Sequence, residues 1–389
     1  MAVLWAVNFF IPMVAISLGV MLPSITEDLS ITPVQAGLLG SSFFIGSALA
    51  ALPASVWLSK YNAKNITSVV LFLAGILTLL QGWAPTFVIL LVTRLFFVLT
   101  MVSRGLMEIL LIQQWFKDKQ FALVISITVG VFSTGQLMAV GLTPFLMTFL
   151  SGWRNVYYAT GVILILGSLI WLLLGRDAPQ IPRSDEDDKK PKSPLLILRE
   201  RPILWVLSAC PSGAALAWAS VMTFWPTYAL DALALPLTFV GALMILFPLG
   251  GIAASFLAGP LSDRIHQRRI FIWAPGILLP PIYVALFTVT SPVLSGILLL
   301  LAGWNAMVWV PIVRTIPFDM NLAPRETVVV IALSMTLVPI GGAVGPILVG
   351  YIQEISGSLQ LGLLSVTAFP LTLFIGGLMI PETSPYHKR

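Results

Sequence analysis

Charged residues, cysteine and histidine are all scarce in this 389-residue chain. Asp, Glu, Lys and Arg together make up 10% of it, and there are one cysteine and two histidines. The single cysteine, Cys210, excludes an intramolecular disulfide. The sequence has no H-E-x-x-H motif and no Walker A motif, which excludes a zinc protease of that type and ATP as the chain's own energy source. We expect no enzymatic activity, no cofactor and no metal.

Long apolar stretches make up most of the remainder. Hydrophobic residues are 58% of the chain, and the mean hydropathy is +0.98. The stretches without any charged residue are 1–26, 29–59, 65–93, 120–153, 202–230, 232–262, 270–313, 327–353 and 355–381. About 20 apolar residues cross a bilayer as one helix, and no soluble fold buries so much apolar surface. The sequence therefore predicts a multi-pass, all-α membrane protein, with its first span retained from Met1 onward.

Turn residues and charges divide these stretches into twelve predicted transmembrane helices. A long polar segment, residues 176–201, separates six of them from the other six, so we expect an N-terminal bundle (1–175), a cytoplasmic linker (176–201) and a C-terminal bundle (202–389). The helices are predicted near 3–23, 34–58, 65–83, 86–115, 120–148, 153–175, 203–227, 236–258, 269–289, 293–315, 326–352 and 359–380.

The positive charges predict the orientation of these spans. All 21 Lys and Arg residues fall in the segments on one side, except Arg94, Arg104 and Arg154. Because basic loops stay in the cytoplasm, both termini are expected there, in a plasma (inner) membrane. The net charge of +5 therefore comes from the basic loops that set the orientation of the spans, and no nucleic-acid partner is expected.

The two halves look like copies of each other at an offset near 204. Gly37 and Gly46 match Gly241 and Gly250, and Ser151-Gly152 matches Ser356-Gly357. Six helices return the chain to its starting side, so the repeats are parallel, and such repeats place a solute site at the midplane between halves.

The strongest local motif is residues 259–269, GPLSDRIHQRR. It resembles the G-x-L-x-D-R-x-G-R-R loop of the major facilitator superfamily, with His266 in place of the glycine. The resemblance implies a 6+6 helix fold, rocker-switch alternating access, a gating role for Asp263 and Arg264, and a monomer. In the first-half copy of this loop, Ser59 replaces the aspartate, and Asn62 is able to take the left-handed turn conformation.

Two further features support this resemblance. Arg94 matches the helix-4 arginine of the family and is expected to have an architectural or gating role. The run Gly341-x3-Gly345-Pro346-x3-Gly350 is similar to the family's glycine-proline motif, here on the repeat-equivalent helix, and predicts close helix packing. Residues 152–154, Gly-Trp-Arg, resemble its organic-anion branches.

Three charges are predicted to lie inside the membrane, all on the helix near 86–115: Arg94, Arg104 and Glu108. A charge at the bilayer centre costs ~2.5–3.5 kcal/mol or more, so each needs a reason. Arg104 and Glu108 are four residues apart and share a face. Arg104 is a candidate anion contact and Glu108 a candidate proton-coupling group; the alternative is a purely structural ion pair between them.

Polar and aromatic residues of other helices complete the predicted solute pocket. The candidates are Gln136, Trp218, Trp304 and Asn305, with Ser133 and Thr134 at similar depth. Gln136 and Asn305 could instead bond between helices, and Trp225 and Tyr228 could be interface anchors. Asn8 is expected to lie shallower, near the cytoplasmic end of the first helix, and is left out of the site.

The sequence thus predicts a secondary transporter of a small organic solute, most simply an organic anion in symport with protons. Two alternatives stay open. One is an exporter of amphipathic or cationic solutes, with Glu108 as the counter-charge and the tryptophans as a cation–π cage. The other is a sensor or lipid-handling protein that uses the same scaffold without transport. The expected partners are a small-molecule solute, the lipid bilayer and protons.

Overall fold

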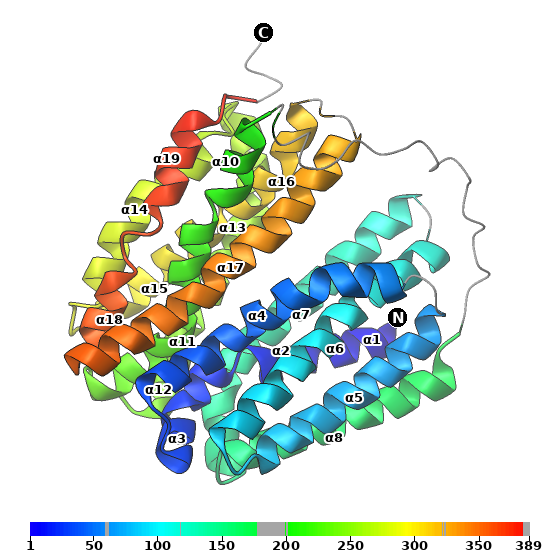
Figure 1. The fold of residues 1–389 in the computed structure, drawn as a ribbon, viewed down its shortest axis with the longest axis vertical. Helices are drawn as coiled ribbons and strands as arrows, with labels where there is room; N and C mark the ends of the chain where they lie inside the picture. The colour runs from blue at the N-terminus through cyan, green and yellow to red at the C-terminus, as the bar shows by residue number, and fades with distance from the viewer. Residues whose placement is uncertain are drawn as a thin grey trace. The chain divides into compact units, whose positions relative to one another are not determined.

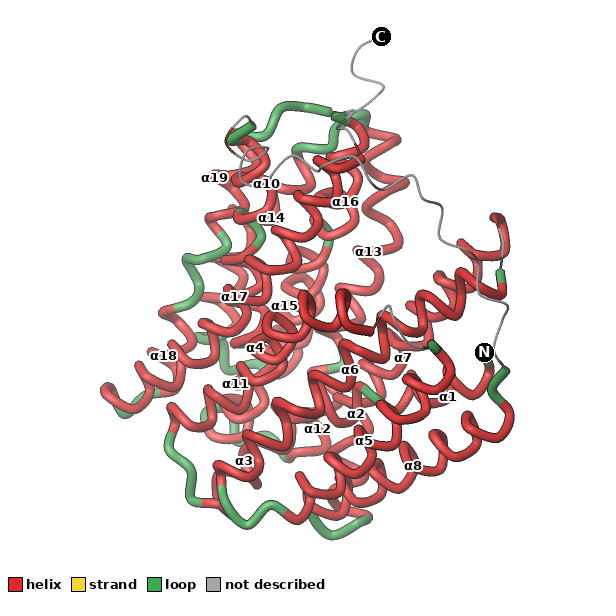
Figure 2. Tube along the Cα trace, turned by 45° about the vertical axis from the view of Figure 1, so that its right-hand side comes forward, coloured by secondary structure: helices red, strands yellow, loops and turns green. Residues whose placement is uncertain are grey.

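The computed structural model describes residues 1–58, 62–116, 118–176, 199, 201–320, 322 and 324–383, with the backbone alone at 50–58, 118–119, 121–122, 324–325 and 328. Throughout this part of the chain the regular secondary structure is helical, and no strand occurs (Figure 2). The chain divides into two compact units, Met1–Asp188 and Lys189–Arg389. Most of the predicted linker, residues 177–198, lies outside the described residues, so the linker and the exact bundle limits stay predictions.

The first predicted span of unit 1 is broken into three helices. α1 runs over Ala2–Phe10, α2 over Pro12–Ala15 and α3 over Leu18–Leu29, and the axis bends by 44° between Ala15 and Leu18. The later helices follow the predicted intervals closely: α4 Pro33–Leu58, α5 Ala63–Trp83, α6 Phe87–Trp115, α7 Asp118–Phe149 and α8 Trp153–Leu174.

Unit 2 contains more interruptions, several of them at proline, which lacks the backbone N–H that continues a helix. Pro211, for example, separates α10 from α11. The helices are α10 Ile203–Ala209, α11 Ser212–Asp231, α12 Leu237–Met244, α13 Leu246–Ile265, α14 Ile270–Leu286, α15 Pro292–Met307, α16 Trp309–Asp319, α17 Pro324–Ser356, α18 Leu359–Ser365 and α19 Leu371–Met379.

The two units repeat the same helix pairings, which supports the predicted duplication. In unit 1 the most extensive contacts are α5 with α8, α5 with α6, and α4 with α6, and α7 packs on α1 and α2 (Figure 1). In unit 2 the corresponding pairs are α14 with α19, α14 with α15, α13 with α15, and α17 with α11. Corresponding helices of the two units therefore pack against corresponding partners.

Glycines allow the closest of these helix approaches. An added Cβ on Gly341 or Gly345 of α17 would meet the carbonyl oxygens of Ser212 and Leu216 on α11. In unit 1, Gly135 of α7 lies in the same way against the Phe9 carbonyl of α1. The close packing predicted from the glycine-proline run is confirmed at Gly341 and Gly345.

The helices are long and apolar enough for a membrane protein. In the part of the chain that the structure describes, eight helices meet the length and hydropathy of a membrane span, or nine if the bent pair of Ala2–Ala15 and Leu18–Leu29 is one span. Two shorter apolar helices, Pro33–Leu49 and Ile270–Leu286, add to these. The arrangement is consistent with twelve spans, because each of the twelve predicted intervals is helical over most of its length.

Candidate functional site

Helix α6 carries all three of the predicted membrane charges, and all three are buried. Arg94, Arg104 and Glu108 are 2%, 5% and 4% exposed. Arg104 and Glu108 form an ion pair, with 3.0 Å between Arg104 Nη1 and Glu108 Oε2. Arg94 has a different set of partners. The structure therefore joins two of the three predicted residues and separates the third.

Asn8 of α1 completes the site around the ion pair. Its side-chain nitrogen Nδ2 donates to Glu108 Oε1 at 2.6 Å, and Asn8 is 1% exposed. Both Glu108 oxygens thus have a partner, one a cation and the other a neutral amide. Within the described residues, Asn8 Oδ1 and Arg104 Nε are buried without a hydrogen-bond partner. The cluster has unused hydrogen-bonding capacity on both sides of the carboxylate.

The sequence interpretation missed Asn8 because it judged depth for each residue separately. Asn8 lies six residues after α1 begins at Ala2, and Glu108 lies seven residues before α6 ends at Trp115. At 1.5 Å per residue, both are about 10 Å from their helix ends. Because the first and fourth spans run in opposite directions, these ends lie on the same side. Counting from that side places the two residues at the same depth, but it does not show that their helices are neighbours.

Arg94 binds the broken first span to its neighbours. It donates from Nη1 to the Val14 carbonyl at 3.2 Å and from Nη2 to the Ala15 carbonyl at 3.2 Å. These carbonyls lie where α2 ends, so the break leaves them in need of donors. Arg94 also donates to Ser42 Oγ at 3.1 Å and to Tyr157 OH at 3.0 Å. This geometry supports the architectural role predicted for Arg94.

The other predicted pocket residue of unit 1, Gln136, lies on α7 and is half-buried. Its neighbour Gly135 packs against the Phe9 carbonyl, one residue from Asn8. Thr134 is exposed and donates to the Gly130 carbonyl of its own helix. Gln136 therefore lies on the helix that packs beside α1, without a recorded bond to the Arg104–Glu108 pair.

The predicted pocket residues of unit 2 lie on α11 and α15. Trp218 stacks on Phe247, with 6.4 Å between ring centroids and an interplanar angle of 26°. Asn305 donates to the Leu301 carbonyl of its own helix at 2.9 Å. Trp304 is half-buried.

Trp225 and Tyr228 are not membrane-interface anchors in this structure. They are 0% and 5% exposed, whereas an anchor places its polar edge at the membrane–water boundary. The Tyr228 hydroxyl donates to the Phe287 carbonyl at 2.6 Å, and Gln360 donates to the same oxygen at 2.7 Å. These bonds connect α11 and α18 to the end of α14.

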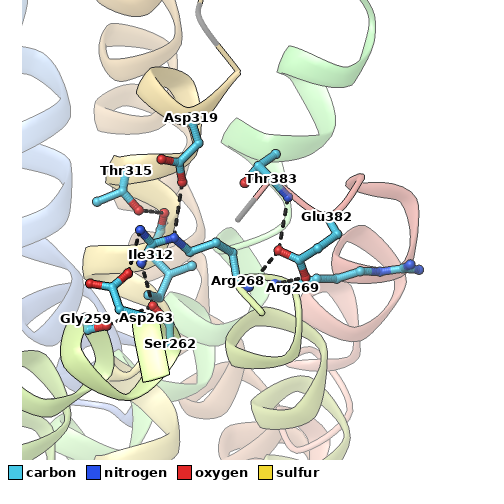
Figure 3. A network of polar contacts seen from close by, with 10 residues as sticks. All are labelled: Gly259, Ser262, Asp263, Arg268, Arg269, Ile312, Thr315, Asp319, Glu382 and Thr383. Atoms are coloured by element: carbon cyan, nitrogen blue, oxygen red, sulfur yellow. Dashed lines mark hydrogen bonds and ion pairs between the residues drawn. The ribbon is translucent and has the colours of Figure 1, made fainter. Parts of the chain in front are cut away.

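A second polar network surrounds the loop motif after α13, with Arg268 at its centre (Figure 3). Arg268 pairs with Asp263 at 2.9 Å and with Asp319 of α16 at 3.2 Å, and it donates to Ser262 Oγ at 2.5 Å. Glu382 accepts the backbone N–H groups of Arg268 and Arg269 at the start of α14. Arg264, a predicted gating residue, is exposed. The motif predicted the charges, but not that Arg268 joins them.

The residues at the glycine position of the two loop copies, His266 and Asn62, differ in backbone conformation. His266, which stands in place of the glycine of the family motif, adopts the left-handed conformation, with φ 60°. Asn62 does not adopt it. With φ −65° and ψ 122°, Asn62 is extended, and its side chain accepts from the Lys64 N–H at 2.9 Å as the N-cap of α5. Capping by a short polar side chain satisfies a free helix N–H, which explains the difference.

Searches for related proteins identify the family. The sequence model of the family described as the Major Facilitator Superfamily matches residues 4–346 and, separately, 212–389. The chain belongs to this superfamily. It is a multi-pass membrane protein and not an enzyme, as the sequence predicted. Among the described residues, no group of three His, Cys, Asp or Glu side chains is placed to hold a metal ion.

Relatives within the superfamily are distant but cover nearly the whole chain. The "Probable sulfoacetate transporter SauU" of Cupriavidus necator is 23% identical over 96% of this chain and 92% of its own. The "Probable galactarate/D-glucarate transporter GudP" of Bacillus subtilis is 24% identical over 92% of this chain and 86% of its own. The crystal structure of a bacterial homologue of the human lysosomal transporter Spinster matches with a TM-score of 0.78 at 19% identity, over 97% of this chain and 93% of that one. That likeness concerns the fold.

Proposed function

We propose that this facilitator is a secondary transporter of a small organic anion, with Arg104 as the residue that contacts the anion. The observation that carries the proposal is the buried Arg104, which pairs with Glu108 through Nη1 and still has an unpaired Nε within the described structure. A buried ion pair adds little net stability after desolvation, so its retention needs another reason. The names of the relatives, which refer to sulfoacetate and galactarate or D-glucarate, support an anionic solute.

Glu108 is the candidate for proton coupling in this proposal. While Glu108 is ionised, it neutralises Arg104 at 3.0 Å. Protonation of Glu108 would weaken this pair and leave Arg104 free to bind an anion, so proton and anion would move in the same direction. Both Glu108 oxygens have partners, Asn8 and Arg104, which speaks against Glu108 as a free counter-charge for a cationic solute.

The remaining residues have supporting roles in the proposed transport cycle. The solute pathway would be lined by Gln136, Trp218, Trp304 and Asn305. Arg94 would stabilise the broken first span through its hydrogen bonds to the Val14 and Ala15 carbonyls. Asp263, Arg264 and their loop would act in gating at the cytoplasmic side. We propose a monomer in the plasma (inner) membrane, with cytoplasmic termini, in which bundles 1–175 and 202–389 alternate in access around the linker 176–201. The concentration of Lys and Arg in the loops on one side of the predicted membrane spans supports this orientation.

The proposal is tested by measuring thermal unfolding of the purified protein with sulfoacetate, D-glucarate and a set of organic cations. A ligand at 100 times its Kd stabilises the folded state by about 2.7 kcal/mol. We expect stabilisation by an anion and its loss in Arg104→Gln. Arg154→Gln is the matched control, because Arg154 also pairs with a carboxylate, Asp28, but in a partly exposed position. Anion binding that survives in Arg104→Gln, or stabilisation by cations alone, would overturn the proposal.

A further inference from the structure

The buried cluster of Asn8, Arg104 and Glu108 contains an acceptor atom and a donor atom that lack partners. Within the described part of the chain, Asn8 Oδ1 and Arg104 Nε are buried atoms without a hydrogen-bond partner. Each belongs to a side chain that also donates to Glu108, Asn8 from Nδ2 to Oε1 and Arg104 from Nη1 to Oε2. An unpaired buried polar atom is unfavourable, so both atoms need a partner.

Glu108 sets which way each of these groups faces. Glu108 Oε1 accepts from Asn8 Nδ2, and it can do so whether the carboxyl is ionised or protonated on Oε2, so the Asn8 oxygen must face elsewhere. Arginine has donors and no acceptor, so Arg104 Nε can bind only an acceptor. The cluster therefore presents an oxygen acceptor from α1 and a cationic donor from α6. A simple anion would satisfy Arg104 and leave Asn8 Oδ1 unpaired.

We propose that Asn8 recognises a hydroxyl group on the solute, next to the acidic group that Arg104 binds. This inference rests on the anion transport proposed above and narrows the solute to a hydroxy acid. An acid oxygen of the solute accepts from Arg104 Nε, and the solute hydroxyl donates to Asn8 Oδ1. Because both atoms are covered by protein in this conformation, neighbouring side chains move aside when the solute enters.

Such a site discriminates against the same acid without its hydroxyl. A site built to bond a hydroxyl is left with an unpaired buried acceptor when the analogue lacks that group. We expect a preference of at least about tenfold for the hydroxy acid, which corresponds to ~1.4 kcal/mol. A water molecule on Asn8 Oδ1 would remove this preference, because it would serve both acids equally.

The test compares the apparent Kd values of matched acids for the purified full-length protein. The pairs are lactate with propionate, malate with succinate, and D-glucarate with adipate. In the wild type, the hydroxy acid of any pair that binds should bind at least about tenfold more tightly. In Asn8→Leu this ratio should fall towards one. The control is Trp5→Phe on α1, the helix that also carries Asn8. It removes the bond from Trp5 Nε1 to Thr128 Oγ1 of α7 and should keep the ratio of the two Kd values.

The outcomes separate this inference from the transport proposal. Equal binding of both acids by the wild type overturns the hydroxyl recognition and leaves anion transport standing. If no acid stabilises the protein, both are overturned. A purely structural Asn8 would weaken both members of a pair equally, so an unchanged ratio in Asn8→Leu also contradicts the inference. If Asn8→Leu does not fold, the wild-type ratio decides alone.

Discussion

His266 ends α13 in the left-handed conformation, at the position where the family motif has glycine. A side chain with a Cβ is strained there by roughly 1–2 kcal/mol, and histidine tolerates it better than a β-branched residue. The turn positions Arg268, which pairs with Asp263 and Asp319. One residue's backbone conformation thus supports the whole network after α13.

We expect His266→Val to destabilise the protein by about 1–2 kcal/mol, because valine is a β-branched residue at positive φ. His266→Gly should be more stable than His266→Val, because glycine adopts a positive φ without strain. Thermal unfolding of the purified variants in detergent measures both. Equal stability of the Val and Gly variants would show that backbone strain at this turn is unimportant.

At the residue scale, the sequence predicted the buried charges but not their partners. Arg104 and Glu108 could be paired from their spacing on one helix. Asn8 and Arg268 could not be recognised in the same way, because their contacts depend on the depth of other helices and on the shape of a turn. A pair within one helix can be predicted from its spacing in the sequence. A pair between two helices can be predicted only when it is known which helices are neighbours and how they are shifted along each other.

Helix breaks are the main feature that the sequence did not predict at the scale of elements. The first span is divided at Ile11 and at Ile16–Ser17, and several predicted spans of unit 2 are divided likewise. A break in a membrane helix is tolerated when other groups satisfy its carbonyls. Here Arg94 supplies two of these bonds from 80 and 79 residues away, which no local pattern reveals.

Replacing Arg94 by lysine tests this dependence. Lysine has a single ammonium in place of the planar fork, and it cannot reach four acceptors at once. We expect Arg94→Lys to lose about 3–5 kcal/mol of stability, because buried carbonyls and a charge lose their partners. Tyr157→Phe, which removes only the bond from Arg94 Nη1 to Tyr157 OH, should lose about 1 kcal/mol. A loss in Arg94→Lys no larger than in Tyr157→Phe would contradict the proposed role.

The contact of α11 with α17 offers a second test on elements. Gly345→Val should destabilise unit 2 by several kcal/mol, on the order of 3 or more, since its Cβ meets the Leu216 carbonyl and the helices must separate. Gly259→Ala is the matched control, because an added Cβ meets nothing within 4 Å there. Alanine should leave stability unchanged or raise it by roughly 0.5–1 kcal/mol. Similar melting temperatures for both variants would argue against tight packing at Gly345.

At the scale of the whole molecule, the fold was largely predictable. Charge-free stretches of bilayer length fixed the helix intervals, and the repeat at an offset near 204 agrees with the helix pairings that recur in the two units. The ends were less accurate: α3 continues to Leu29 and α13 to Ile265, beyond predicted ends at 23 and 258. Helices extend past the apolar core into polar surroundings, and hydropathy does not record this extension.

The polar bonds of the first span have a consequence for the order in which the protein is made. Asn8 obtains its partner from Glu108, 100 residues later, and the Val14 carbonyl obtains its partner from Arg94, 80 residues later. At a synthesis rate of about 5–20 residues per second, this delay is roughly 4–20 s. During that time the first span is in the membrane without the residues that satisfy its amide and its broken turn. The polar contacts of the first span are therefore completed only when the fourth span arrives beside it.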